Sequence, residues 1–367
     1  MVPNGGKVVI PLDGQPLGNF GYAAISIINC DKKLFLLYSP AFVRVGLDEV
    51  NVPHPIPYQG SKRAIARHIL PYIPVGTKRL VEPFAGSAAV SLAVACRKKA
   101  QLFWLNDSNE PLANLWLSII NEPTKVLTAY QRLWQEQEGQ EADYYKQVRE
   151  KFNKTQKPGY LLYLLARCVK AAVRYNSNGE FNQSPDNRRK GMRPATMKAQ
   201  IVGASSLLEK RSKVTSLDFR VVLDAVTVED VVYMDPPYQG VCSNRDRRYI
   251  GSLEFDSFVD SLEALNANRV SYIVSYDGRT GTKKFGQDLP KSLDLVHEEI
   301  KAGKSSQATL LGRAEDTYES LYLSPALINR LERTPREKQL SLSIISGASE
   351  TSPRLSETVS GGYEQTC

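Results

Sequence analysis

The segment from residue 78 to residue 107 most constrains the fold of this chain. Its first part, KRLVEPFAG (78–86), has the apolar pattern of a short strand that runs into a tight turn, and SAAVSLAVACRKKA (87–100) has the pattern of a helix of small residues. AQLFWLND (100–107) predicts a second strand, which ends at Asp107. Strand, helix and strand in this order predict a β-α-β unit, whose two strands pair in parallel.

The same alternation of strand and helix returns after residue 212. The later segments are, in order, KVTSLDF (213–219), DVVYMD (230–235), the helix SFVDSLEALNAN (257–268), VSYIVSYD (270–277), LDLVHEEI (293–300) and YESLYLS (318–324). These patterns predict an α/β fold with a mostly parallel sheet. Ligands of such sheets bind at the carboxyl ends of the strands, so we expect Asp107, Asp235 and Asp277 to meet at one crevice.

The chain divides into four regions by pattern and composition. Residues 55–108 and 206–330 carry the α/β pattern, and residues 109–205 form a mostly helical insertion between the two halves. Residues 1–54 form an N-terminal extension of unknown role. The tail, residues 331–367, is rich in Ser, Thr, Gly and Glu, a composition that predicts disorder.

The composition excludes several classes of protein. The chain has five cysteines, three histidines and no C-x-x-C, so we expect neither a disulfide framework nor a metal site, and a reducing compartment fits. No apolar run reaches the ~18 residues of a membrane span. The formal net charge is +8, and neither residues 1–52 nor residues 331–367 contribute to the positive excess. A basic middle favours a polyanionic partner, although a basic enzyme without such a partner is an open alternative.

The turn EPFAGSAAV (82–90) has the residues of a ligand-binding turn. Gly86 allows the backbone to approach a ligand, and Asp107 follows it by 21 positions, the offset at which an acid at the end of the next strand reaches a ribose hydroxyl. A tight turn without a ligand is the alternative. In the preceding YQGSKR, Lys62 has the charge to bind a carboxylate and Tyr58 has a ring to cover another ring; a solvated helix start is the alternative there.

The second motif is DPPY, residues 235–238, at the end of the predicted strand 230–235. Pro236 and Pro237 have no N–H groups, so their carbonyls present acceptors in a rigid arrangement. Together with the Asp235 carboxylate and the ring of Tyr238, they suit a flat molecule that bears an NH₂ group. The amine is then the nucleophile, and a ribose-bearing cofactor with a carboxylate and an electrophilic carbon is S-adenosylmethionine.

At these residues the chain resembles the Dam-like DNA adenine N(6)-methyltransferases of the α group. The resemblance covers about residues 55–325, and its motifs follow the family's order: YQGSK, VEPFAGSAAV, LND, RYNSNGEFN, LDF and YMDPPY. The family commonly carries F-x-G-x-G, whereas Ala88 stands at the second glycine here, and we expect a subtle change in cofactor fit. The resemblance implies a Rossmann-like, S-adenosylmethionine-dependent methyltransferase sheet whose helical insertion, 109–205, is the target-recognition region.

The resemblance also implies roles for individual residues. The implied cofactor contacts are Tyr58, Lys62, Phe84, Ala85, Gly86, Asp107, Asp218, Phe219 and Asp235. The implied contacts to the target base are Asp235, Pro236, Pro237 and Tyr238. The implied DNA contacts are in the loop that contains Arg174, Asn176 and Asn178. By their charge, Arg188, Arg189 and Lys190 after this loop and Arg245 after DPPY are candidate phosphate contacts. A base inside a duplex cannot reach a crevice at a sheet edge, so it must be flipped out. A solvated hairpin and solvated basic faces are the alternatives for the DNA contacts.

The predicted function is therefore site-specific methylation of adenine N6 in double-stranded DNA, in the cytoplasm of a bacterial-type cell and with a separately encoded restriction endonuclease as a possible partner. A cytosine N(4)-methyltransferase uses the same amine geometry but more often carries Ser in place of Asp235. Methyltransferases of glutamine side chains or RNA amines favour Asn there. Cytosine C(5) chemistry needs a nucleophilic Cys, usually after Pro, and the sequence has no Pro-Cys. A methylase-like module that binds DNA without turnover is a further alternative.

Overall fold

A computed structural model describes residues 51–237, 255–280, 283–285, 288–304 and 316–333, together with three N-terminal strands, β1 (Val8–Val9), β2 (Ala24–Cys30) and β3 (Lys33–Ser39). The three strands form a separate antiparallel sheet in the order β1-β2-β3. Tyr238 and the arginines at 245, 247 and 248 lie outside the described residues, and so does the tail from residue 334.

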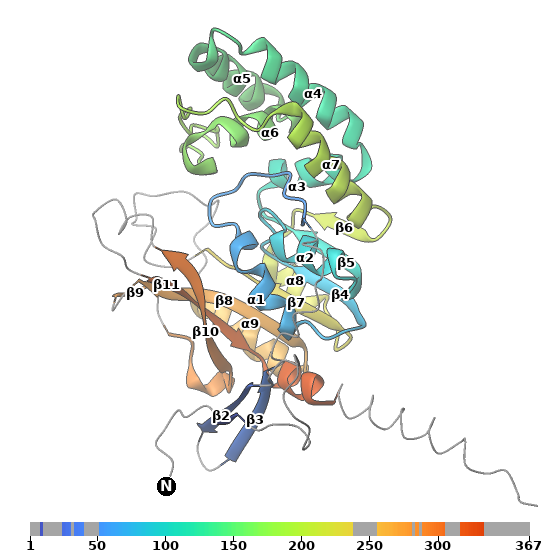
Figure 1. The fold of residues 1–367 in the computed structure, drawn as a ribbon, viewed down its shortest axis with the longest axis vertical. Coiled ribbons are helices and arrows are strands. Elements are labelled where there is room, and N and C mark those ends of the chain that lie inside the picture. Colours follow the sequence, from blue (N-terminus) through green and yellow to red (C-terminus); the bar gives the residue numbers. More distant parts are fainter. Residues whose placement is uncertain are drawn as a thin grey trace, which may run out of the picture.

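The main sheet has the order β10-β11-β8-β7-β4-β5-β6, with β9 paired to β8 (Figure 1). Its parallel strands are β4 (Thr77–Glu82), β5 (Ala100–Asn106), β6 (Ser212–Thr215), β7 (Asp230–Met234) and β8 (Ser271–Thr280). The antiparallel strands are β9 (Lys283–Phe285), β10 (Val296–Lys304) and β11 (Asp316–Leu323). The predicted fold class, an α/β protein with a mostly parallel, Rossmann-like sheet, is confirmed.

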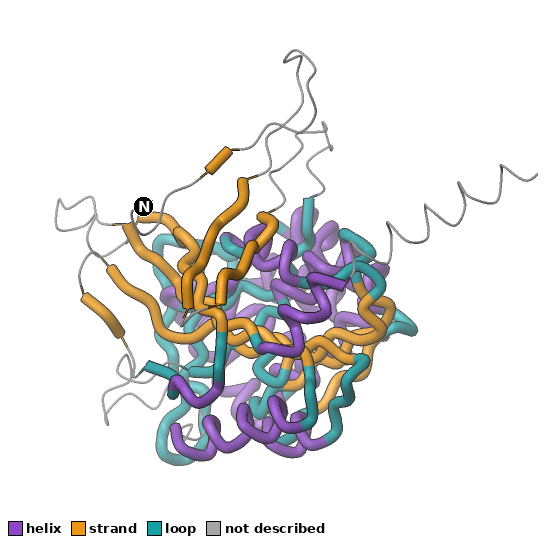
Figure 2. The backbone as a smooth tube through the Cα atoms, turned by 90° about the horizontal axis from the view of Figure 1, so that it is seen from below, coloured by secondary structure: helices purple, strands orange, loops and turns teal. Residues whose placement is uncertain are grey.

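Helices lie on both sides of the strands (Figure 2), which explains why β7 is apolar at every position after its first residue. Val231 and Tyr233 pack in one core cluster with α2 (Ala89–Cys96). Val232 and Met234 pack in the other, which contains residues of α8 (Phe219–Asp224) and α9 (Phe255–Ala267). A strand buried on both faces leaves its carboxyl end as the place where it meets solvent or ligand.

The helices between β5 and β6 gather at one end of the molecule (Figure 1). They are α3 (Glu110–Asn121), α4 (Pro123–Glu136), α5 (Glu141–Thr155), α6 (Pro158–Arg167) and α7 (Pro194–Leu208). Their apolar faces share one core cluster with the sheet. None of the helices in the described ranges has the length and apolarity that a membrane crossing requires.

Four local expectations differ from the structure, three of them in the predicted helices and strands and one in the assigned tail. The apolar pattern of residues 158–173 predicts one helix, but α6 ends at Arg167, because Cys168 is extended and Lys170 and Ala171 have positive φ angles of 58° and 53°. The pattern KRAIARHILPYI (62–73) predicts one helix that ends at Pro74, but the structure has three short pieces, η1 (Lys62–Ala64), α1 (Ala66–Ile69) and η2 (Leu70–Tyr72).

The third difference is at the ends of the last strands. β8 continues past Asp277 to Thr280, so Asp277 does not follow the strand as expected. Residues 331–333, assigned to the tail, are the end of a helix that covers 325–333.

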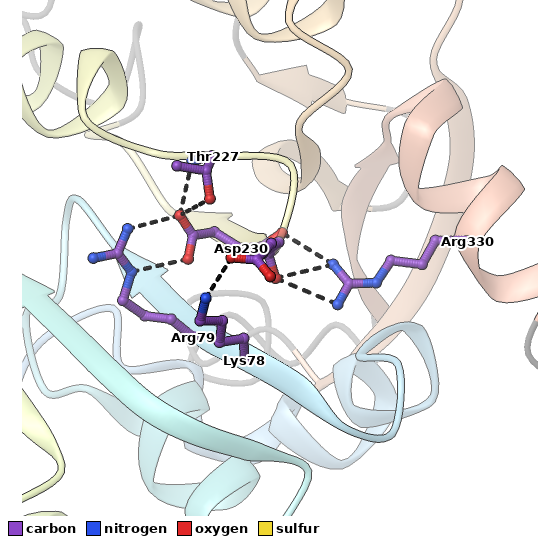
Figure 3. A network of polar contacts seen from close by, with 6 residues as sticks. Lys78, Arg79, Thr227, Asp230 and Arg330 are labelled. Atoms are coloured by element: carbon purple, nitrogen blue, oxygen red, sulfur yellow. Dashed lines mark hydrogen bonds and ion pairs between the residues drawn. The ribbon is translucent and has the colours of Figure 1, made fainter.

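An ion-pair network holds the amino ends of β4 and β7 together (Figure 3). Asp230 accepts two hydrogen bonds from Arg79, at 2.9 and 2.7 Å, and one from the backbone N–H of Thr227 at 2.8 Å. From the helix at 325–333, Arg330 donates to the Asp230 carbonyl at 3.2 Å and to the Glu229 carbonyl. This end of the sheet lies opposite the carboxyl ends of the parallel strands.

Candidate active site

A cavity of about 430 Å³ opens at the carboxyl ends of β4, β5 and β7. Its size lies within the range of pockets for small-molecule cofactors. The residues predicted from sequence that line it are Tyr58, Lys62, Phe84, Ala85, Gly86, Asp107, Asp218, Phe219, Asp235, Pro236 and Pro237. The structure therefore brings the two predicted pockets together in one cavity.

The glycine turn and the acid of the next strand are joined directly. Gly86 has a φ of +49°, and its N–H donates to Asp107 Oδ2 at 2.9 Å. The N–H of Asn109 donates to the other oxygen, Oδ1, at 2.9 Å. Burial raises the pKa of Asp107, and these two N–H groups oppose that rise. The carboxylate is thus held in one orientation, as recognition of a ribose hydroxyl pair requires.

Aromatic rings form one wall of the cavity. The rings of Phe84 and Phe219 lie 5.3 Å apart between centroids. Asp218 caps α8 by accepting the N–H of Arg220 at 2.9 Å, and the Arg220 guanidinium donates to both Asp218 oxygens at 2.8 and 2.9 Å. The apolar rings beside a fixed carboxylate suit a flat base with an amine. Sequence reasoning missed Arg220, which also lines the cavity.

Lys62 connects the predicted base-binding aspartate to an unpredicted acid. Its ammonium lies 3.0 Å from Asp235 Oδ1 and also forms an ion pair with Glu319 of β11. Burial lowers the pKa of Lys62, but the two carboxylates outweigh it, so the pKa stands above its ordinary value. Asp235 and Glu319 together carry more negative charge than the Lys62 ammonium neutralises, which disfavours a third carboxylate beside it. Contact between Lys62 and the cofactor's carboxylate therefore stays a prediction.

Glu82, the last residue of β4, is a second acid that sequence reasoning missed. It lines the cavity, is 2% exposed and accepts the N–H of Ser91 at 2.6 Å. Burial raises its pKa to about 7, against opposing hydrogen bonds from Ser91. The signal in the sequence that could have identified Glu82 was an acidic residue at the apolar end of a predicted strand.

Replacing Glu82 by glutamine is expected to remove a pH dependence of stability. An unfolded glutamate loses its proton above pH 4.5, whereas folded Glu82 keeps its proton to about pH 7. The stability from Glu82 is therefore complete below pH 4.5 and is lost as the pH rises through 7. Between pH 5 and 8 the wild type should lose about 2–3 kcal/mol of unfolding free energy relative to Glu82→Gln. Urea unfolding of both proteins at the two pH values measures this, and a constant difference would contradict it.

Two substitutions in the turn, at residues 86 and 88, are expected to change different properties: one the binding of the cofactor and the other the stability of the fold. Ala88 is fully buried at φ 47° and ψ 35°, a left-handed conformation that costs an L-residue about 1 kcal/mol, so Ala88→Gly should stabilise the fold by up to that amount. Gly86→Ala adds a Cβ 3.1 Å from the Tyr58 ring at a positive φ, and should weaken cofactor binding. Thermal unfolding measures the stability of the two variants, and calorimetry measures their affinity for S-adenosylmethionine. Equal losses of affinity in Ala88→Gly and Gly86→Ala would contradict these expectations.

The loop that contains three predicted DNA contacts is a hairpin at the mouth of the cavity. Tyr175 and Phe181 form an antiparallel bridge at its base, and Arg174 and Asn178 are exposed. Asn176 also has a local role: its side-chain oxygen accepts the N–H groups of Asn178 (3.0 Å) and Glu180 (2.9 Å), and its contact with DNA stays a prediction. Asn176 therefore shapes the turn in the free protein.

Tyr175 links this hairpin to the cofactor side of the cavity. Its hydroxyl donates to Asn109 Oδ1 at 3.0 Å, and the Asn109 N–H binds Asp107. Both Tyr175 and Asn109 line the cavity, and neither was singled out from sequence. A tyrosine within a turn-rich stretch was the available signal.

The basic stretch after the hairpin is exposed but ordered. Arg188 and Arg189 pair with Asp186 at 3.1 and 3.5 Å, and Lys190 pairs with Glu141 at 3.0 Å. The three basic side chains remain 86%, 69% and 58% exposed, so their present partners are weak competitors for a phosphate. The predicted contact at Arg245 lies outside the described residues.

A Rossmann-like sheet, a glycine turn bonded to Asp107 and an Asp-Pro-Pro sequence after β7 are the features of a Rossmann-like methyltransferase. The chain belongs to the D12 class N6 adenine-specific DNA methyltransferases, whose family model matches residues 58–304. This confirms the predicted family and enzyme class.

Relatives with known names agree with this family. The chain is 32% identical to the retron Ec67 DNA adenine methylase of Escherichia coli over 283 residues, which are 73% of this chain and 90% of that protein. It is 32% identical to the DNA N-6-adenine-methyltransferase of Escherichia phage P1 over 187 residues, 50% of this chain but 23% of that protein. It is 28% identical to the type II methyltransferase M.MjaIII of Methanocaldococcus jannaschii over 173 residues, 44% of this chain and 59% of that protein.

Proposed function

We propose that this chain transfers a methyl group from S-adenosylmethionine to the N6 amine of an adenine flipped out of double-stranded DNA. One observation carries the proposal: the Asp235-Pro236 acceptor pair and the Gly86–Asp107 pair line the same cavity. A nucleoside cofactor and a second base with an exocyclic amine therefore fit side by side. Each of the chain's groups has a chemical task in that arrangement.

The aromatic wall and Asp107 hold the cofactor. Phe84 and Phe219 pack against its adenine, Asp218 accepts from its adenine amine, and Asp107 accepts from its ribose. When bound, S-adenosylmethionine supplies an electrophilic methyl group on a positively charged sulfur. The cavity also contains Asp235, whose carboxylate favours the cationic cofactor over its product, which carries one positive charge less.

Asp235 and Pro236 orient the substrate amine. The carboxylate and the Pro236 carbonyl each accept one amine hydrogen, which turns the nitrogen lone pair away from the ring and toward the methyl carbon. Bound S-adenosylmethionine would supply the methyl carbon: as the amine nitrogen bonds to it, the C–S bond would break and its electron pair would stay with the sulfur. The amine becomes acidic only as the bond forms, so its proton leaves afterwards, with Asp235 in place to accept it.

The product of the reaction tests the proposal. Duplex DNA is incubated with the protein and S-adenosylmethionine, and its nucleosides are separated by mass spectrometry. N(6)-methyladenine is the expected product. N(4)-methylcytosine alone would favour the cytosine alternative, and binding of DNA without any methylated base would favour a module without turnover. Mapping modified bases in a methylation-free bacterial host would then give the recognition site.

Partners and location follow from the same proposal. M.MjaIII is named a type II methyltransferase, which motivates the proposal of a separate restriction endonuclease that cuts the same site. A DNA substrate supports the proposed location in the cytoplasm of a bacterial-type cell. Deleting the gene while a neighbouring nuclease gene is kept should then be lethal, whereas a solitary methyltransferase gene would be dispensable.

Neutralising the basic stretch is expected to weaken DNA binding regardless of sequence. Replacing Arg188, Arg189 and Lys190 by glutamine should lower the slope of log affinity against log salt by up to about 0.9 for each lost phosphate contact. Fluorescence anisotropy at several salt concentrations measures the slope. Glutamine at Lys78, Arg269 and Lys291 is the matched control, because Lys78 lies at the start of β4, Arg269 lies just before β8, Lys291 begins a 3-10 helix (Lys291–Leu293), and none of them lines the cavity. Equal slopes for both triple variants would assign the stretch to a solvated face.

A further inference from the structure

A second carboxylate reaches the Lys62 ammonium from a strand that none of the sequence motifs includes. Glu319 lies on β11, forms an ion pair with Lys62, and its Oε1 accepts a hydrogen bond from Ser275 Oγ at 2.7 Å. Ser275 is fully buried on β8. The side chains of Lys62 and Glu319 are 9% and 14% exposed, so this contact is largely shielded from water.

The backbone aims Glu319 at this position. The register between β8 and β11 shifts between Glu319 and Leu321, an irregularity of the kind that redirects side chains beside active sites. Gly278 pairs with Glu319 in that register, and a Cβ at residue 278 would lie 2.5 Å from the carbonyl oxygen of Tyr318. The close approach of the two strands at Glu319 therefore depends on glycine at residue 278.

We propose that Glu319 is a positioning residue for methyl transfer, which holds the Lys62 ammonium so that Lys62 fixes the Asp235 carboxylate through Oδ1. The inference rests on the proposed function, in which Asp235 orients the substrate amine. With Oδ1 fixed at 3.0 Å from Lys62, the direction of the second Asp235 oxygen is set as well. Without Glu319, a second carboxylate no longer holds the Lys62 ammonium away from Asp235. Lys62 then moves closer to Asp235, where it competes with the substrate amine for the carboxylate.

Asp235 and Glu319 both stabilise the charged form of Lys62, and they do so in different ways. Lys62 is nearly buried, and burial alone would favour its neutral form. During the reaction Asp235 also accepts a hydrogen bond from the substrate amine, whereas Glu319 stays tied to the sheet through Ser275. Glu319 thus keeps the cation in place while Asp235 works.

Steady-state kinetics on duplex DNA test this role. Glu319→Gln retains the shape and an acceptor for Ser275 but loses the charge, and kcat should fall by about 10- to 100-fold while both KM values stay within about threefold. If Glu319 acts through Lys62, the double variant Lys62→Met/Glu319→Gln should be no slower than Lys62→Met alone. Glu299→Gln is the matched control, because Glu299 is exposed on the neighbouring strand β10 opposite Ser320, and it should match the wild type.

A second variant keeps the test decisive if Glu319→Gln folds poorly, as judged by its thermal transition. Ser275→Ala removes only the hydrogen bond to Glu319, and should lower kcat by about two- to fivefold, again with no further loss in a Lys62→Met background. Multiplying losses in the double variants, or losses confined to KM, would overturn the role. A wild type that leaves adenine unmethylated would instead refute the proposed function, an outcome that the same assay shows separately.

Discussion

Alanine in place of Asp235 is expected to reduce the rate of methyl transfer by about 10³-fold, the size of effect seen when a group that acts mainly in the transition state is removed. Asp235 follows β7, lines the cavity and reaches Lys62 through Oδ1. Its substitution does not leave a buried cation alone, because Lys62 keeps its ion pair with Glu319. The fold and the binding of DNA should therefore largely survive.

Single-turnover methylation of duplex DNA measures the rate, and fluorescence anisotropy measures DNA affinity. Asp224→Ala is a suitable control, because Asp224 is exposed on α8 and does not line the cavity. Asp235→Asn retains one acceptor oxygen and should fall between the wild type and Asp235→Ala. A rate within tenfold of the wild type, or a parallel loss of DNA affinity, would show that Asp235 has a structural role.

The largest effect on stability is expected at the opposite end of the sheet. Asp230 is 2% exposed, and its carboxylate accepts hydrogen bonds from Arg79 and from Thr227 (Figure 3). Asp230→Ala removes the buried partner of an ion pair whose Arg79 side chain is 26% exposed, and should lower the free energy of unfolding by about 3 kcal/mol. The rate of methyl transfer per folded molecule should not change, because this network lies away from the cavity.

The adjacent acid offers a matched control. Glu229 pairs with Lys78, but the two side chains are 58% and 57% exposed, so Glu229→Ala should cost less than about 1 kcal/mol. Urea unfolding at neutral pH measures both variants. Similar losses for Glu229→Ala and Asp230→Ala would mean that burial of the pair does not set its contribution.

The local parts of the site were predictable from sequence. The glycine turn at Gly86, the strand before Asp107 and the strand before Asp235 each show their structure within about ten residues, because burial sets the apolar runs and the strand end sets the place of the acid. Gly86 and Asp107 line one cavity, but the hydrogen bond between them was not predicted and is a finding of the structure. Consecutive parallel strands carry such residues to the same edge of the sheet, whatever the remainder of the chain does.

The tertiary structure alone decided which groups those residues meet. Glu319 reaches Lys62 because β11 inserts antiparallel beside β8 with a shifted register, and no periodicity in the sequence reports strand order or register. Tyr175 reaches Asn109 only after α6 ends early and the chain turns back toward the cavity. Apolar patterns indicate burial along a single element, whereas ion pairs and hydrogen bonds between distant elements depend on how those elements pack. The motifs could therefore be identified from the sequence, but the residues that they contact could not.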